Sequence, residues 1–282
     1  MVINGRTDLA SELRRRLCDG SSVTELPGVR AREEQIGIFP VTAVEILDER
    51  GARALGKPRG TYITMELPSR LQDCLVPAAE GLAGLIRRCA GTLPPRVLLA
   101  ALGNPDITPD ALGSLAAGQL LVTEHLKRTD PASFAAFRGT LLCRPGVLGT
   151  SGVESARQIR ALCQETGPDL VIAIDALAGA DLRLLCRSVQ ICNTGISPGS
   201  GVGNSREALN RESLGIPVLA IGVPTVVDAS ALSPNPELRG MFVTPRSIDS
   251  QVRACGRLIA WGVNLALHEG LSIEEMQLLL EG

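Results

Sequence analysis

Two aspartates that follow apolar stretches are the residues of this sequence best placed to do chemistry. Asp110 lies in the segment LGNPDITPDALG (102–113), directly after the apolar run VLLAAL, and Asp175 follows the apolar run LVIAI. Short apolar runs predict buried parallel strands, whose carboxyl ends meet at one edge of a sheet. If these strands are neighbours, the two carboxyl groups can share a proton and titrate as a pair. One could then act as base on a water molecule while the other acts as acid.

Each aspartate also has a purely structural explanation. Thr108 is a good helix N-cap, Pro109 suits the first helical position, and Asp110 in the first turn would interact favourably with the helix dipole. Asp175 could cap the short helical turn expected after it. A carboxyl group at the sheet edge is partly removed from water, which raises its pKa unless a donor or a cation is close. Local sequence leaves both interpretations open.

A glycine-rich segment, NTGISPGSGVGN (193–204), is the third candidate. Its glycines permit positive φ and close approach of the backbone, and we expect them to leave N–H groups free. Such a loop could hold a substrate carbonyl or a developing oxyanion, could form a phosphate nest, or could be a mobile structural loop. It lacks the Lys-Ser/Thr pair of a nucleotide-binding P-loop. The residues predicted to contact substrate are Gly199, Ser200, Gly201, Gly203 and Asn204.

Three further polar residues are possible supports for a site at this edge. Asn104 lies in the turn that precedes Asp110. Glu154 follows Ser151 by three residues, which is the spacing of a helix capping box and gives Glu154 a structural explanation. Asp228 follows the apolar run VLAIG at some distance and could reach the same edge.

No local pattern indicates a metal site or a serine or cysteine nucleophile. His125 and His268 are the only histidines, and the eight cysteines include no Cys-x-x-Cys pair. A Gly-x-Ser-x-Gly elbow is also missing. We therefore predict no metal and no cofactor. The thiols are expected to be reduced core residues of a cytoplasmic protein.

Composition argues against binding to nucleic acid or membrane. Hydrophobic residues make up 45% of the 282 residues and charged residues 21%, as in an ordinary globular protein. Aromatic residues make up only 2%, too few for a surface that stacks on single strands. The net charge of −2 creates no field that attracts nucleic acid or anionic lipid. No apolar run approaches the length of a membrane span.

Alternating strand and helix patterns predict an α/β fold with a mostly parallel sheet covered by helices on both faces. We predict a single domain, 1–282, in which residues 71–282 form the α/β core and residues 1–70 form an N-terminal extension with a β-hairpin. Strands are expected at 39–47, 61–67, 97–102, 170–174, 189–191 and 217–222. Helices are expected at 9–17, 75–90, 108–121, 151–165, 248–268 and 272–280.

Five segments in this order resemble the signature segments of the spore germination protease family: LGNPDITPDALG, PGVLGTSGVE, DLVIAIDALA, NTGISPGSGVGN and LGIPVLAIGVPTVVDA. The similarity extends to RTDLASE near the start, to VEILDERGARALGKPRGTYITMELP, and to VTPRSIDSQV near the end. It therefore covers nearly the whole chain.

This resemblance implies a fold related to that of the hydrogenase-maturation proteases and an atypical aspartic endopeptidase. Family members are homotetramers of the forespore and spore core that degrade small acid-soluble spore proteins during germination. They are made as zymogens that remove a short N-terminal segment, and 1–70 has such a propeptide-like start. By motif match the catalytic aspartates are Asp110 and Asp175. The family prefers an acidic residue near the scissile bond, and Arg206, Lys127 and Arg128 are basic candidates to receive it.

Departures from the family pattern motivate two alternatives. Ser197 stands where relatives usually carry His, only residues 1–6 precede TDLASE, and the chain is shorter between 67 and 97. The first alternative is a catalytically silent relative that binds spore proteins or another partner without cutting them. The second is a metal-assisted peptidase in which Asp110, Asp175 and His125 are ligands.

Overall fold

The computed structural model describes residues 6–19, 26–204, 206–233, 235–238 and 240–281. Within these residues the strands form one nine-stranded sheet in the order β1-β2-β3-β7-β8-β6-β4-β5, with β9 paired to β8. The strands are β1 (Val29–Ile36), β2 (Phe39–Ile46), β3 (Gly60–Glu66), β4 (Arg96–Ala101), β5 (Gly139–Cys143), β6 (Leu170–Gly179), β7 (Ser188–Cys192), β8 (Val218–Asp228) and β9 (Phe242–Val243).

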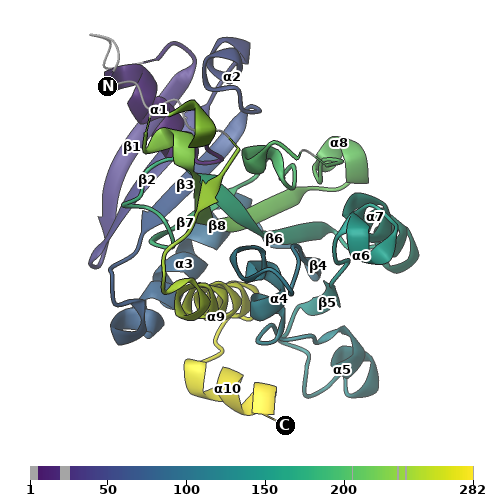
Figure 1. Ribbon diagram of the computed structural model, residues 1–282. Helices are drawn as coiled ribbons and strands as arrows, with labels where there is room; N and C mark the ends of the chain where they lie inside the picture. The colour runs from purple at the N-terminus through teal and green to yellow at the C-terminus, as the bar shows by residue number, and fades with distance from the viewer. Residues whose placement is uncertain (1–5, 20–25, 205, 234, 239, 282) are drawn as a thin grey trace.

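Helices connect and cover these strands (Figure 1). The α-helices are α1 (Ala10–Asp19), α2 (Glu49–Leu55), α3 (Leu75–Ala90), α4 (Leu112–Ala117), α5 (Glu124–Thr129), α6 (Leu148–Ser151), α7 (Ser155–Thr166), α8 (Arg211–Leu214), α9 (Ile248–Leu267) and α10 (Ile273–Glu281). Short 3₁₀ turns are η1 (Leu71–Cys74), η2 (Thr108–Asp110), η3 (Ser200–Val202), η4 (Ala229–Ala231) and η5 (Pro236–Leu238). None of the described helices is long and apolar enough to cross a membrane.

The parallel part of the sheet consists of β8, β6, β4 and β5, which lie side by side. These are the strands connected through helices, as the βαβ arrangement of an α/β fold requires. The strands β1, β2, β3, β7 and β9 run antiparallel to their neighbours and extend the sheet. The predicted α/β class is confirmed, and its parallel strands are the ones whose carboxyl ends carry the candidate residues.

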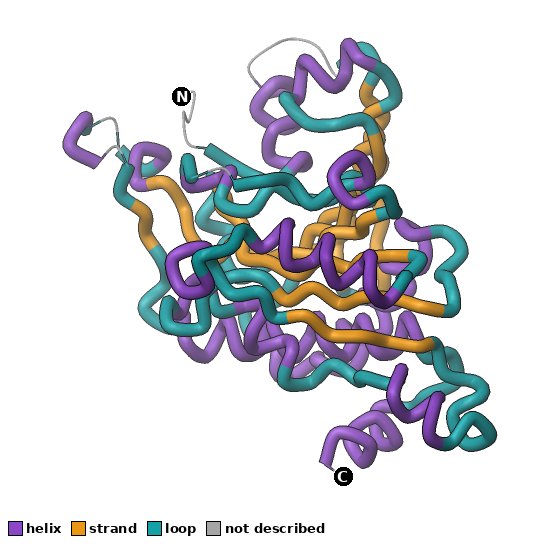
Figure 2. The backbone as a smooth tube through the Cα atoms, turned by 90° about the vertical axis from the view of Figure 1, so that its right-hand side faces the viewer, coloured by secondary structure: helices purple, strands orange, loops and turns teal. Residues whose placement is uncertain are grey.

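The central strands bury both of their faces because helices cover both sides (Figure 2). On β4, Val97 and Leu99 belong to the larger core, which includes α3, α4 and α9. The alternate residues Leu98 and Ala100 belong to the core on the opposite face, which includes Ile159 of α7. Side chains of a strand alternate between faces, so an apolar strand of this kind must be covered twice. Each fully buried Leu or Ile contributes about 1.5–3 kcal/mol relative to exposure.

The N-terminal residues pack on the antiparallel part of the sheet. Ala10 of α1 and Leu55 of α2 share a buried cluster with Val44, Ile46 and Tyr62 of β2 and β3. Asp48 caps α2 by accepting hydrogen bonds from the N–H groups of Arg50 and Gly51. The three strands from the first 70 residues are therefore part of the same sheet as the α/β core, and α1 lies against it.

Several predicted elements differ from those observed. The helix expected at 108–121 is replaced by η2 and the six-residue α4. The helix expected at 151–165 begins at Ser155, after the separate turn α6, so Glu154 precedes it and makes no side-chain capping bond. The strands expected at 170–174 and 217–222 continue to Gly179 and Asp228. The edge strand β1 was not predicted, because its sequence VRAREEQI is polar and mostly exposed.

Candidate active site

Asp175 lies on β6 at the point where the neighbouring strand β4 ends. The β4–β6 pairing runs to Ala101 opposite Ile174, while β6 and β8 stay paired beyond Asp175. The side chain is only 4% exposed, and its Oδ1 accepts a hydrogen bond from the N–H of Ala176 at 2.9 Å. Burial, followed by the negative charge of Asp110, holds the pKa of this carboxyl well above its usual range. Asp175 is therefore the group of this pair best suited to hold a proton.

Asp110 reaches the same edge from the turn after β4. Gly103 in this turn has φ +95°, and a Cβ there would lie 2.0 Å from the carbonyl oxygen of Asp110, so only glycine fits. The N–H of Asn104 donates to Oδ2 of Asp110 at 2.8 Å. Burial raises the pKa of this half-buried carboxyl, while the hydrogen bond from Asn104 acts in the opposite direction. Asp110 is the last residue of η2, whose N-cap is Ile107, so neither the N-cap expected at Thr108 nor the long helix expected after it is present.

The two aspartates line one cavity of about 530 Å³. The supporting candidates Asn104 and Glu154 line it too, as do the glycine-loop residues Gly199, Gly201 and Asn204. The wall also contains apolar side chains, among them Ile107, Val202 and Phe242. The sequence-based pairing of the aspartates thus corresponds to one shared cavity in the fold.

Two other candidates lie elsewhere. Asp228 ends β8 and caps η4 by accepting from the N–H of Ser230 at 2.9 Å, and it is not among the residues that line the cavity. His125 is exposed on α5, also away from the cavity wall. The ligand set of Asp110, Asp175 and His125 is therefore not brought together. Among the described residues, no group of three or more His, Cys, Asp or Glu is arranged to hold a metal ion.

Four N–H groups of the glycine loop are used within the loop, and among its glycines the N–H of Gly203 is not free, contrary to our expectation. The amides of Ser200, Val202, Gly203 and Asn204 donate to carbonyl oxygens within the loop. Because they lack a side chain, Gly201 and Gly203 allow the segment that contains Arg6 and Asp8 to lie close to the loop. A Cβ on Gly201 would lie 2.1 Å from Oδ2 of Asp8. A Cβ on Gly203, whose φ is +76°, would lie 1.9 Å from a guanidinium nitrogen of Arg6.

The segment 6–12, RTDLASE, therefore lies in the cleft between the glycine loop and the end of β6. Asp8 pairs with Ala178 through both its backbone and its side chain: its N–H donates to the carbonyl of Ala178 at 2.8 Å, and its Oδ2 accepts from the N–H of Ala178 at 2.9 Å. Leu9 is fully buried in an apolar cluster with Leu177 and Leu184. Residues 6–9 precede α1, and Asp8 contacts β6 as a residue of an added strand would, whereas residues 10–12 form the first turn of α1.

Further contacts fix the residues after Leu9. Gln190 of β7 accepts from the N–H of Ala10 at 2.9 Å and donates to the carbonyl of Asp8 at 3.0 Å. The carboxylate of Glu12, only 3% exposed, accepts from the N–H groups of Ala180 and Asp181. Burial raises the pKa of Glu12. These bonds satisfy buried polar groups that would otherwise be costly.

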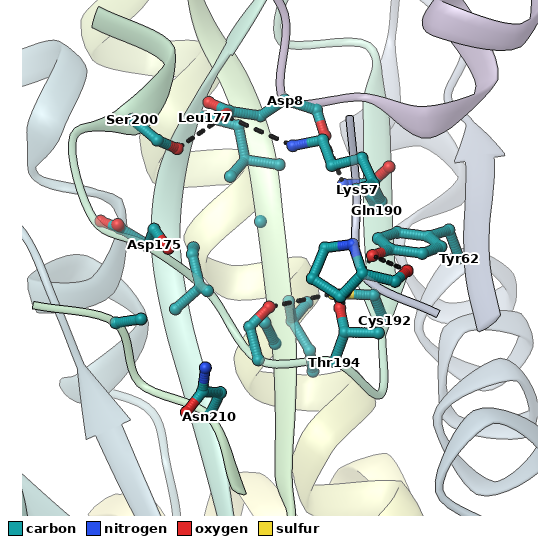
Figure 3. A pocket seen from close by; sticks show the side chains of 18 of the residues that line it. Asp8, Lys57, Tyr62, Asp175, Leu177, Gln190, Cys192, Thr194, Ser200 and Asn210 are labelled. Carbon is teal, nitrogen blue, oxygen red and sulfur yellow. Dashed lines mark hydrogen bonds and ion pairs between the residues drawn. The ribbon is translucent and has the colours of Figure 1, made fainter. Parts of the chain in front are cut away.

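A second, smaller cavity of about 210 Å³ adjoins the first. Asp8 and Asp175 are among the residues that line both cavities. Figure 3 shows Asp8 between Ser200 and Lys57, with Tyr62, Gln190 and Cys192 on the side of Lys57. Ser197, where the sequence resemblance led us to expect His, also lines this cavity.

Asp8, Lys57 and Gln190 were not among the predicted site residues. Gln190 is a buried polar residue inside an apolar strand, which is the kind of local signal that can mark a binding role. Asp8 and Lys57 carry no such local signal. Their place in the cleft depends on contacts between segments about 170 and 50 residues apart in the sequence.

Comparison with known proteins shows the family of the chain. The sequence profile of the germination protease family matches residues 6–236. A germination protease of Caldanaerobacter subterraneus subsp. tengcongensis is 39% identical over 99% of both chains. The chain belongs to the germination protease family. Another germination protease, from Clostridium perfringens, is 36% identical over 99% of this chain and 100% of its own length. One from Bacillus cereus is 40% identical over 81% of this chain and 64% of its own.

Membership of the germination protease family makes the chain a peptidase. Among solved structures, the [NiFe] hydrogenase maturation protease HycI of Thermococcus kodakarensis KOD1 is similar, with a TM-score of 0.32 and 20% identity over 60% of this chain and 92% of that one. The fold described above rests on the strand pairing and not on this likeness.

Proposed function

We propose that this germination protease family member is an aspartic endopeptidase that uses Asp110 and Asp175 to cut small acid-soluble spore proteins during germination. The observation that carries the proposal is the pair of carboxyl groups in one cavity, both with raised pKa values, at the carboxyl edge of a parallel sheet. Two interacting carboxyl groups whose environments separate their proton affinities can supply an acid and a base together.

The environments of the two groups support different roles for them in this proposal. Asp175 is the more deeply buried, and the charge of Asp110 disfavours its ionised form, so Asp175 carries the proton. Asp110 receives the N–H of Asn104, which stabilises a carboxylate, so Asp110 is the base. Asp110 takes a proton from a water molecule that attacks the scissile carbonyl, and Asp175 gives its proton to the carbonyl oxygen. When the C–N bond breaks, Asp110 passes its proton to the leaving amine and Asp175 regains one from the intermediate.

The cleft favours an extended and unstructured substrate. Residues 6–9, which precede α1, are bound there through the backbone hydrogen bond from Asp8 to Ala178 and through the buried Leu9. A chain that is disordered before binding can adopt this conformation without first unfolding. Small acid-soluble spore proteins, the substrates that the sequence resemblance implies, would meet this requirement.

The same segment supports the expectation of a zymogen. Residues 7–12 occupy the cleft beside Asp175, so a substrate must displace them before it can bind there. The chain then acts as its own competing ligand until the segment is released or cut. Assembly as a homotetramer and action in the spore core are part of this proposal on the strength of the family resemblance.

The test compares Asp110→Asn and Asp175→Asn with the unchanged chain, using a purified small acid-soluble spore protein and mass spectrometry of the products. Asp228→Asn is the matched control, because it changes a buried aspartate at the end of the neighbouring strand that does not line the cavity. We expect discrete cleavage by the unchanged chain and by the control, and none by either catalytic variant.

Two results would contradict this proposal. Full cleavage by both catalytic variants would exclude the two-aspartate mechanism. A folded unchanged chain that binds the spore protein and never cuts it, even after residues 1–8 are removed, would establish the catalytically silent alternative. The Ser197→His variant then separates the causes, because recovery of cleavage would assign the silence to that position.

A further inference from the structure

The carboxylate of Asp8 occupies a built pocket. Its Oδ1 accepts from the hydroxyl of Ser200 at 3.0 Å, and its Oδ2 accepts from the N–H of Ala178 at 2.9 Å. The ammonium group of Lys57 lies 3.8 Å from Oδ1 (Figure 3). Only 13% of the Asp8 side chain is exposed. Two donors and one cation thus converge on a single acidic side chain beside the candidate catalytic pair.

Lys57 is fixed in this position by the fold. It follows α2, where Gly56 ends the helix in the left-handed conformation and the N–H of Lys57 donates to the carbonyl of Ala52. Its side chain is 21% exposed, so it is held against the cleft and does not extend into water. No other ion pair of Asp8 is present among the described residues.

The basic residues proposed from sequence have other partners. Arg206 lies 3.8 Å from the carboxylate of Glu154, and both residues line the larger cavity but not the smaller one that contains Lys57. The ammonium group of Lys127 donates to the carbonyl oxygens of Phe134 and Phe137. None of these three residues lines either cavity. Lys57 is the cation that contacts Asp8, the acid of the chain's own segment in the cleft.

We propose that Lys57, with the hydroxyl of Ser200 and the N–H of Ala178, forms a carboxylate-binding subsite, and that Lys57 sets the preference for an acidic side chain at the substrate position now filled by Asp8. This inference rests on the proposed endopeptidase function. The hydroxyl of Ser200 can donate to an amide oxygen as well as to a carboxylate, so it selects weakly between Asp and Asn. The ammonium group of Lys57 interacts with net charge and makes the distinction.

The first test needs no catalysis and uses the full chain. Hydrogen exchange of residues 9–12 is measured in the unchanged chain, in Asp8→Asn, in Lys57→Met and in the double variant. A partly buried charge contact predicts that each single change speeds exchange about tenfold, and that the double variant exchanges no faster than either single variant. Lys57→Arg should retain most of the protection. Arg59→Met is the control, because it removes an exposed charge two residues away.

The second test measures selectivity. Peptides with the sequence of residues 6–19, one with Asp and one with Asn at position 8, are cleaved by the unchanged chain and by Lys57→Met. We expect the ratio of kcat/KM values for the two peptides to fall about tenfold in Lys57→Met, with the loss confined to the Asp peptide. The chain's own segment competes equally with both peptides, so the ratio does not depend on it.

The outcomes separate this inference from the proposed function. Additive effects in the exchange experiment, or an unchanged selectivity ratio, would overturn the role of Lys57 while leaving the peptidase intact. If the unchanged chain cuts neither peptide and no spore protein, the proposed function fails. The exchange experiment still decides whether Lys57 binds the acid.

Discussion

Replacing His268 by leucine is expected to remove a loss of stability that the unchanged protein suffers on acidification. His268 follows α9, is 2% exposed, and neither of its ring nitrogens hydrogen bonds to a described residue. Its ring contacts Phe137, with ring centroids 5.1 Å apart. Burial, then the positive charges of Arg138 and Lys127, lower the pKa of His268 from 6.5 to about 4.

The lower pKa of His268 in the folded chain determines the sign and the size of the change in stability with pH. Above pH 6.5 the imidazole is neutral in the folded and unfolded chains, so it adds no pH dependence. Below pH 6.5 the unfolded chain takes up a proton that the folded chain refuses until about pH 4, so the free energy of unfolding falls through this window. Each pH unit is worth about 1.36 kcal/mol, which gives a total of about 3 kcal/mol.

Urea unfolding at pH 7.5 and at pH 4.0 measures the effect. The carboxyl groups also titrate in this range, but their contribution is common to both proteins and cancels in the difference between His268→Leu and the unchanged chain. His125→Leu is the matched control, since His125 is the only other histidine and is exposed. We expect about 3 kcal/mol less acid destabilisation in His268→Leu and no change in the control. Equal acid destabilisation in all three proteins would refute the reasoning.

Three further changes test the placement of the site. Gly201→Ala introduces a Cβ 2.1 Å from the carboxylate of Asp8, so we expect residues 6–12 to leave the cleft and to become sensitive to an added protease; continued resistance would contradict this. Gly113→Ala brings a Cβ within 2.3 Å of a carbonyl oxygen just after β4, so we expect a loss of about 1–3 kcal/mol in urea unfolding. Asp110→Asn removes a charge that raises the pKa of Asp175, so the NMR titration of Asp175 should move to lower pH; an unchanged midpoint would show that the two do not interact.

The pairing of the aspartates could be predicted because each is positioned by its own strand. A buried parallel strand reads as a continuous apolar run, and the residue that follows such a run lies at the carboxyl edge of the sheet. Asp110 and Asp175 follow two runs that form the adjacent strands β4 and β6. Asp175 lies inside β6 and not at its end, because β6 continues along β8 after β4 has stopped. The position of the carboxylate relative to β4 is nevertheless the one expected.

The helix after Asp110 could not be predicted correctly from propensity. The run from 108 to 121 contains good helix formers, yet regular helix covers only 112–117. Packing accounts for the difference: Gly113 lies against the backbone of Leu102 and Ile174, and η2 brings Asp110 back over Gly103. Tertiary contacts therefore override local propensity at the place where the carboxyl group must turn toward Asp175.

The acid-binding pocket lay beyond the reach of local patterns for a different reason. Asp8 and Lys57 are ordinary charged residues in polar segments, and their environments arise from pairing with Ala178 and from the end of α2. Ser200 was predicted as a loop residue that contacts substrate, but its partner in the structure is the chain's own Asp8. Local sequence patterns predict strands and turns, but they do not predict which distant segment of the chain will occupy a cleft.

The distribution of cations around the cleft explains how the aspartate pair keeps its raised pKa values. Lys57 and Arg206 both have side chains lining the cavities, yet their ion-pair partners are Asp8 and Glu154. Among the described residues no ion pair involves Asp110 or Asp175, so burial is not offset by a nearby positive charge. A lysine bound directly to Asp175 would favour its ionised form and remove the proton that the proposed mechanism requires. An acid at position 8, or its equivalent in a substrate, gives Lys57 a partner other than Asp110 and Asp175.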